Sequence, residues 1–160
     1  MGEGEFALVR RELDTAFGLS QDFEYVGDHD VHTALVDVAS LQRDEAAIRA
    51  YAPPAEALAI RYDHKLYQGI ISRAWGVAHR LAGEFDLAGA RFSQALSLFT
   101  GLGARWQLGR THFELGELAV ARGDTAEARA CFNRASADFE AMRAAPDLER
   151  ARAALERLTG

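Results

Sequence analysis

The chain repeats its own pattern at a regular interval. Glycine, alanine and phenylalanine positions of one stretch recur in the next, in the pairs Gly76/Gly116, Gly83/Gly123, Ala88/Ala128, Phe92/Phe132, Ala95/Ala135 and Phe99/Phe139. The numbers of each pair differ by 40, and a period in this range indicates helix-turn-helix units that stack side by side. Such stacks offer extended binding surfaces, and nothing in the repeat itself implies chemistry.

Apolar spacing places the helices of the clear pair of units. The first helix is expected over about 66–81 and ends at Gly83, and Asp86 is a candidate N-cap for the second helix, which carries Phe92 and Phe99. The next unit begins with a helix over about 104–121, followed by a turn and cap at 123–125 and a helix through Met142. A last helix begins at Pro146-Asp147. Its polar residues are expected on an outer, solvated face, as a terminal cap requires: Glu149, Arg150, Arg152, Glu156 and Arg157.

A third, degenerate copy lies upstream. Its first helix is expected over about 31–41, and its second begins near Asp44. Pro53-Pro54 lies inside that second helix, where proline removes backbone donors and clashes with the preceding turn. The prolines therefore predict a kink or break after Tyr51, with a new helical segment over 54–63. Residues 5–17 are expected to form one more amphipathic helix, and residues 18–30 a loop.

The length and the charge of the chain limit its domain organisation and its possible partners. The 160 residues are expected to form one domain. Residues 1–45 hold 11 acidic and 3 basic side chains, a net charge of −8, whereas the remainder holds 13 and 15, a net of +2. A net acidic chain without a basic cluster argues against nucleic-acid binding. Membrane spans are not expected, and the single cysteine, Cys131, fits a reducing, cytoplasmic location.

The paired units resemble the tetratricopeptide repeat. The pattern of that family appears as Trp75-Gly76, Gly83, Ala88, Phe92 and Ala95, and again as Leu115-Gly116, Gly123, Ala128, Phe132 and Ala135. The resemblance implies an all-α solenoid of about three helical pairs, with an N-terminal helix and a C-terminal cap helix. The expected parts of this single domain are 1–28 (helix and loop), 29–65 (degenerate repeat), 66–103 and 104–143 (repeats), and 146–160 (cap). The spacing of 40 exceeds the usual 34, which implies longer helices.

A narrower resemblance involves the runs 62–84 and 104–111. These runs look like the C-terminal repeat regions of large bacterial signalling proteins, in which a STAND-type ATPase core is often fused to a cyclase or a transcription-factor domain. The resemblance implies that this chain is the sensor or scaffold end of such a regulator. The ATPase motif GxxxxGK[ST] does not occur in the sequence, so no ATPase, cyclase or DNA-binding activity is carried over.

Candidate chemical sites are few. The run Asp28-His29-Asp30-Val31-His32 has metal-ligating residue types, but a structural site needs a closed set of four ligands, so a polar loop with Asp30 as a helix cap is the favoured interpretation. Cys131 beside Phe132 is expected to be a buried structural thiol. No nucleophile and base converge. The sequence therefore predicts a protein that is not an enzyme and has no cofactor or metal.

The concave groove is the remaining candidate site. In the repeat family this groove is lined by one face of each first helix, and those positions carried over to this chain are Asp30, Thr33, Asp37, Ile70, Arg73, Val77, Arg80, Arg110, Phe113, Glu117 and Val120. The predicted partner-binding residues among them are Arg73, Val77, Arg80, Arg110, Phe113 and Glu117. The arginines are expected to form a basic strip for a carboxylate or an acidic peptide. The alternative is a solvated face with intramolecular ion pairs. Val77 and Glu114 stand where chaperone-binding members use asparagine, so recognition of chaperone tails is not expected.

The favoured function is a non-catalytic module that binds a protein or peptide partner in this groove, within a larger regulator. A small-molecule sensor that holds a metabolite in the hollow of the solenoid is the alternative. Self-association through the terminal helix or an exposed apolar helix face is left open, as are the identity of the partner and the completeness of the chain.

Overall fold

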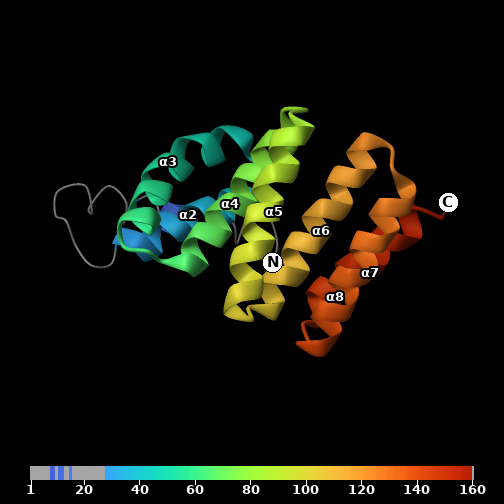
Figure 1. The fold of residues 1–160 in the computed structure, drawn as a ribbon. Coiled ribbons are helices and arrows are strands. Elements are labelled where there is room, and N and C mark those ends of the chain that lie inside the picture. Colours follow the sequence, from blue (N-terminus) through green and yellow to red (C-terminus); the bar gives the residue numbers. More distant parts are fainter. Residues whose placement is uncertain (1–7, 10, 13–14, 16–27, 160) are drawn as a thin grey trace.

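The computed structural model describes residues 28–159 together with 8–9, 11–12 and 15. The region from residue 28 onward is entirely helical apart from its turns (Figure 1). Its helices are α2 (Asp28–Leu41), α3 (Glu45–Arg61), α4 (Lys65–Leu81), α5 (Phe85–Leu102), α6 (Arg105–Arg122), α7 (Thr125–Ala141) and α8 (Ala145–Arg157).

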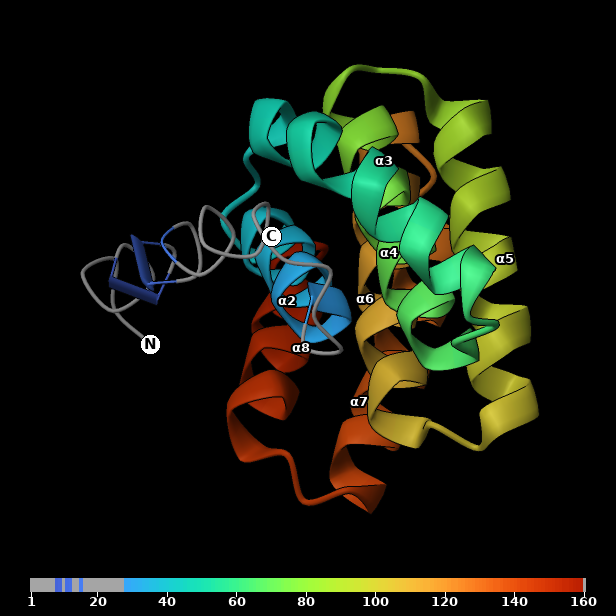
Figure 2. The ribbon, with the colours of Figure 1, turned by 90° about the vertical axis from the view of Figure 1, so that its left-hand side faces the viewer.

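The helices stack as antiparallel pairs, α2 with α3, α4 with α5 and α6 with α7, and α8 packs on α7. The first helices of the pairs also contact one another in order, α2 with α4 and α4 with α6. Figure 2 shows α3 and α5 on one side of the stack and α2 and α8 on the other. The predicted all-α solenoid of helical hairpins is confirmed, and α2, α4 and α6 form its inner layer.

Phenylalanine side chains of the outer helices pack against glycines of the inner helices. A Cβ atom on Gly116 would lie 2.5 Å from Cε1 of Phe132, and Gly76 meets Phe92 in the same way one repeat earlier. Both phenylalanine side chains are fully buried. Burial of such a side chain is worth about 1.5–3 kcal/mol, so this packing explains why glycine and phenylalanine recur with the repeat.

The turns between helices share one backbone conformation. One residue in each turn adopts a positive φ, and these residues recur at a constant interval along the chain: Arg43, Asp63, Gly83, Gly103, Gly123 and Arg143. Two successive intervals, each holding a helix and its turn, make one helical pair and therefore one period of the sequence repeat. Glycine adopts this left-handed conformation without steric cost, whereas other residue types rarely do.

The prolines of α3 do not interrupt it. The helix is continuous from Glu45 to Arg61, so of the predicted kink or break the break is wrong, as is the separate segment over 54–63, while the ribbon bends along its length (Figure 2). Pro53 and Pro54 lie on the exposed side of the helix. Water can hydrate the carbonyl groups that lose their backbone donors there, which lets the helix bend without ending.

Several helix ends differ from the expectation by a few residues. Helix α2 begins at Asp28, so the predicted loop over 18–30 extends too far, and Glu84 rather than Asp86 precedes the first residue of α5. Asp124 accepts a hydrogen bond from the backbone N–H group of Glu127, which confirms the predicted cap, and Asp44, near which a helix was expected to begin, caps α3 through the N–H group of Ala47. In the predicted helix 5–17, the described residues 8–9, 11–12 and 15 are helical, and the others lie outside the described residues.

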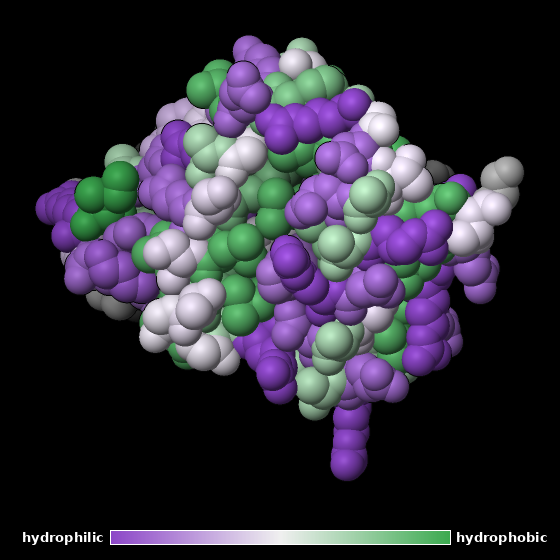
Figure 3. All heavy atoms as spheres, turned by 45° about the vertical axis from the view of Figure 1, so that its right-hand side comes forward, coloured by the Kyte–Doolittle hydropathy of each residue, from purple (hydrophilic) through white to green (hydrophobic). Residues whose placement is uncertain are grey.

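The surface mixes charged and apolar residues. Figure 3 shows one face, on which hydrophobic residues lie between hydrophilic ones. None of the helices in the described part of the chain combines the length and hydropathy that crossing a membrane requires.

Candidate binding surface on the inner face

Asp37 joins the three inner helices through two arginines. It lies on α2 and accepts two hydrogen bonds from Arg110 of α6, at 2.9 and 3.0 Å, and one from Arg73 of α4, at 3.1 Å. Arg73 also donates to Oε1 of Gln107 at 2.5 Å. Only 2% of the Arg73 side chain and 9% of the Arg110 side chain are exposed. The inner layer therefore contains a buried ionic network rather than a purely apolar core.

Electrostatics set the charge state of this network. Burial works to raise the pKa of Asp37, but the two arginine charges and their hydrogen bonds outweigh it and hold the pKa below 3.8. Burial and the neighbouring charge of Arg110 lower the pKa of Arg73 to about 10. Both groups therefore stay ionised at neutral pH, and the network carries two positive charges against one negative charge.

A second network surrounds Glu114 of α6. Arg43, from the turn between α2 and α3, donates to Oε1 of Glu114 at 2.6 Å, and Arg80 of α4 donates to Oε2 at 3.4 Å. The Nε atom of Arg80 is buried and has no hydrogen-bond acceptor among the residues that the structure describes. Two arginines thus share one carboxylate here as well.

The residues predicted to line the groove do share the inner face, but most of them are enclosed. Arg73, Val77, Arg110 and Phe113 are buried, and the arginines are occupied by carboxylates of the chain itself. The side chain of Arg80 is 11% exposed and that of Glu117 is 24% exposed. The anticipated intramolecular pairs are present, although they are buried rather than solvated. Of the predicted set, Glu117 is the most accessible.

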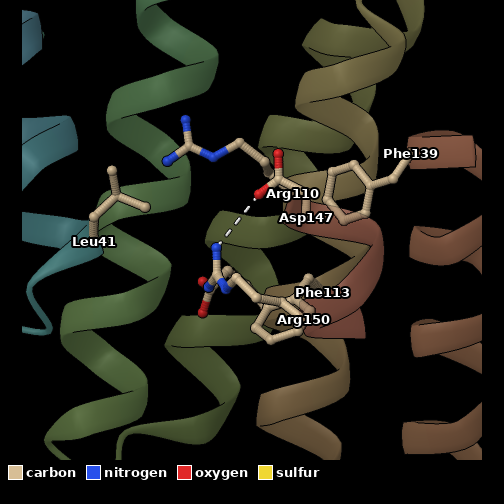
Figure 4. Close-up of a pocket in the computed structure, with 7 residues that line it drawn as sticks. Leu41, Arg110, Phe113, Phe139, Asp147 and Arg150 are labelled. Atoms are coloured by element: carbon tan, nitrogen blue, oxygen red, sulfur yellow. Dashed lines mark hydrogen bonds and ion pairs between the residues drawn. The ribbon is translucent and has the colours of Figure 1, made fainter. Parts of the chain in front are cut away.

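The space beside Arg110 is small. Leu41 of α2, Phe113 of α6 and Arg150 of α8 are among its lining residues, and Figure 4 shows Arg150 reaching toward Asp147. Its volume of about 10 Å³ allows about one water molecule. This part of the inner face cannot receive a ligand without moving side chains.

An open hollow lies farther along the inner face. It has a volume of about 290 Å³, and its walls come from the turn after α2, from α6 and from the cap helix α8. We call it the cap hollow and define it by its lining residues: Arg43, Phe113, Glu117, Arg150, Ala153 and Arg157.

The cap hollow brings in arginines that the sequence pattern did not single out. Arg157 donates to Glu117 at 3.2 Å, and the guanidinium of Arg150 lies 4.9 Å from the centre of the Phe113 ring. Both arginines are exposed, as expected for a solvated face, but they also line the hollow, which the sequence did not predict. Arg150, Ala153 and Arg157 are spaced i, i+3 and i+7, and this helical stripe was the available signal.

The other candidate sites have structural explanations. Among residues 28–159 and the few described before them, no group of three His, Cys, Asp or Glu side chains is arranged to hold a metal ion. Asp30 accepts a hydrogen bond from the Tyr67 hydroxyl, which raises the pKa of Tyr67 to about 12 with help from burial. Cys131 is buried, and burial together with a hydrogen bond to Glu127 raises its pKa to about 12. These groups tie helices together or lie in the core.

Comparison with known proteins identifies the repeat. The family model described as tetratricopeptide repeat matches residues 67–141, which include most of α4, all of α5 and α6, and α7. Neither the curated proteins nor the solved structures contain a significant match to the chain. Tetratricopeptide repeats generally mediate protein–protein interaction and scaffolding, and the family is typically non-catalytic. The match supports the assignment of the helical pairs over residues 67–141 to the tetratricopeptide-repeat family.

Proposed function

We propose that this chain is a non-catalytic interaction module that binds a segment of a partner protein on its inner face, and that it forms the regulatory end of a larger signalling protein. The cap hollow is the observation that supports the proposal most directly, because it is an open concavity on the face that the repeats present inward.

The size of the hollow favours a protein segment over a metabolite. A volume of about 290 Å³ is at the lower end of the range for sites that enclose small molecules. A peptide needs to insert only one or two side chains, while the rest of its length lies along the surface. The metabolite-sensor alternative predicts that a small molecule alone raises the melting temperature.

A random peptide library tests this function. Phage that display random dodecapeptides are selected on the immobilised chain, and enriched peptides are synthesised and titrated. Ala153→Trp fills the hollow from an exposed position of α8, and Ala137→Trp makes the same change on the exposed side of α7. We expect peptides whose binding is lost with Ala153→Trp and kept with Ala137→Trp. A selection that yields no binding peptide contradicts the function, and peptides that bind both variants equally contradict its location.

A further inference from the structure

Positive charge concentrates on the inner face of a chain that is acidic as a whole. The cap hollow has three arginines against the single carboxylate of Glu117. Behind it, Arg43 and Arg80 share Glu114, and Arg73 and Arg110 share Asp37. The complete sequence has a net charge of −6. The inner face is therefore a local positive region that overall composition does not explain.

The arginines of the hollow are accessible to a ligand. The exposed fractions of their side chains are 30% for Arg43, 50% for Arg150 and 67% for Arg157. The pairs of Arg150 with Asp147 and of Arg157 with Glu117 are partly solvated and therefore weak, whereas Arg43 is paired with the buried carboxylate of Glu114. A carboxylate that enters the hollow can therefore displace the pairs of Arg150 and Arg157 at little cost, while Arg43 contributes its charge from beside Glu114. Arginine presents a planar fork of donors that matches the two oxygens of a carboxylate.

Arg43 occupies a position that the equivalent turns fill with glycine. The turns between the two helices of each pair have Arg43, Gly83 and Gly123 at the residue with positive φ. The φ of Arg43 is 58°, a conformation that is uncommon for residues with a side chain. From this backbone position the guanidinium of Arg43 extends to the inner face, where it donates to Glu114 and lines the hollow.

We infer that the cap hollow binds an acidic peptide segment, with Arg43, Arg150 and Arg157 as the residues that recognise its carboxylates. This inference rests on the proposed function and names the chemistry of the partner. Arg150 and Arg157 are two helical turns apart, a rise of about 10.5 Å along α8. In an extended segment that rises about 3.3 Å per residue, acidic side chains about three positions apart span this interval.

Glu117 limits the affinity of the hollow for acids. Among the residues that the structure describes, it is the only acidic one that lines the hollow, and it accepts a hydrogen bond from Arg157 at 3.2 Å. Removing its charge releases Arg157 and removes a repulsion for the incoming carboxylate. A purely structural role for the Arg157–Glu117 pair predicts no gain in binding when Glu117 is neutralised.

Two measurements test the inference: the net charge of the selected peptides, and the loss of their binding when an arginine of the hollow is replaced by glutamate. Random dodecapeptides selected on the intact chain are expected to be enriched in Asp and Glu relative to the library. Arg157→Glu is expected to weaken binding of an acidic peptide by about tenfold or more. Arg152→Glu is the matched control. It makes the same change of charge on the same helix, but Arg152 does not line the hollow. Arg157→Lys should retain most of the affinity, and Glu117→Gln should increase it.

The outcomes separate this inference from the function on which it rests. Selected peptides without acidic enrichment, whose binding is still blocked by Ala153→Trp, would overturn the acidic class and leave the interaction function standing. Equal losses with Arg157→Glu and Arg152→Glu would overturn recognition by the hollow, because overall charge would then account for binding. A selection without binders would overturn both. Melting curves of all variants verify that each is folded.

Discussion

Arg110 donates two parallel hydrogen bonds to the carboxylate of Asp37, a residue 73 positions earlier in the chain. The contact joins the first inner helix to the third across the second, and Arg73 of the second helix binds the same carboxylate. A repeat protein is held together mainly by contacts between neighbouring units. This network is an exception, because it couples three successive units through one side chain.

Replacing Asp37 by alanine should destabilise the fold strongly. The substitution leaves two buried arginines that repel each other, and breaking a buried ion pair on one side costs about 3–5 kcal/mol. Denaturant unfolding followed by circular dichroism measures the change in the free energy of unfolding. Asp86→Ala is the control, because Asp86 is fully exposed and pairs with Arg122 at the surface. A loss no larger than that of the control would contradict the role given to Asp37.

The stability of the protein should fall in acid partly because of Asp37. Its pKa in the folded state lies below 3.8, so the folded state binds its proton less readily than the unfolded state does. The resulting stability is complete above the pKa of the unfolded chain, and it is lost as the pH falls below 3.8 through the pKa of the folded state. Asp37→Asn should show a shallower decrease of unfolding free energy over this window. Parallel curves for the two proteins would show that other carboxyl groups account for the acid sensitivity.

Gly116 should not tolerate a side chain. A Cβ atom there would lie 2.5 Å from the ring of Phe132, and overpacking of this kind costs about 1–3 kcal/mol. Gly101 is the matched position, since it is helical and a Cβ atom on it would have no neighbour within 4 Å. Gly101→Ala should be neutral or stabilising by up to about 1 kcal/mol, because alanine favours the helix. Melting temperatures compare the two variants, and similar values would contradict the packing described.

Cys131 should react slowly with thiol reagents in the folded protein. The thiol is buried and its pKa is raised to about 12, so the reactive thiolate is scarce at mildly alkaline pH. In denaturant, the final absorbance of an Ellman reaction should correspond to one thiol per chain. Without denaturant, the absorbance should rise slowly. Rapid labelling of the folded protein, with its helical circular dichroism unchanged, would contradict the burial of this side chain.

The repeat could be predicted from the sequence because the residues that define it lie close together along the chain. Gly76 and Phe92 belong to the two helices of one hairpin, and Gly116 and Phe132 repeat the pair in the next hairpin. The cap at Asp124 and the helix start near Asp44 could be predicted for the same reason, since a cap depends only on the few residues that follow it. Whether the prolines of α3 bend or break the helix could not be predicted locally, because it depends on their exposure to water, which the packing of the hairpin determines.

The inner face was decided by tertiary structure. The sequence placed Arg73 and Arg110 on the correct side of their helices, but their partner Asp37 comes from another unit, 36 and 73 residues away. Likewise, the cap hollow exists only because the stack brings the turn at Arg43, the helix α6 and the cap helix α8 together. Local patterns determine which residues face inward. The rotation between successive units determines which of those residues meet, and hence which charges are paired and which remain accessible to a partner.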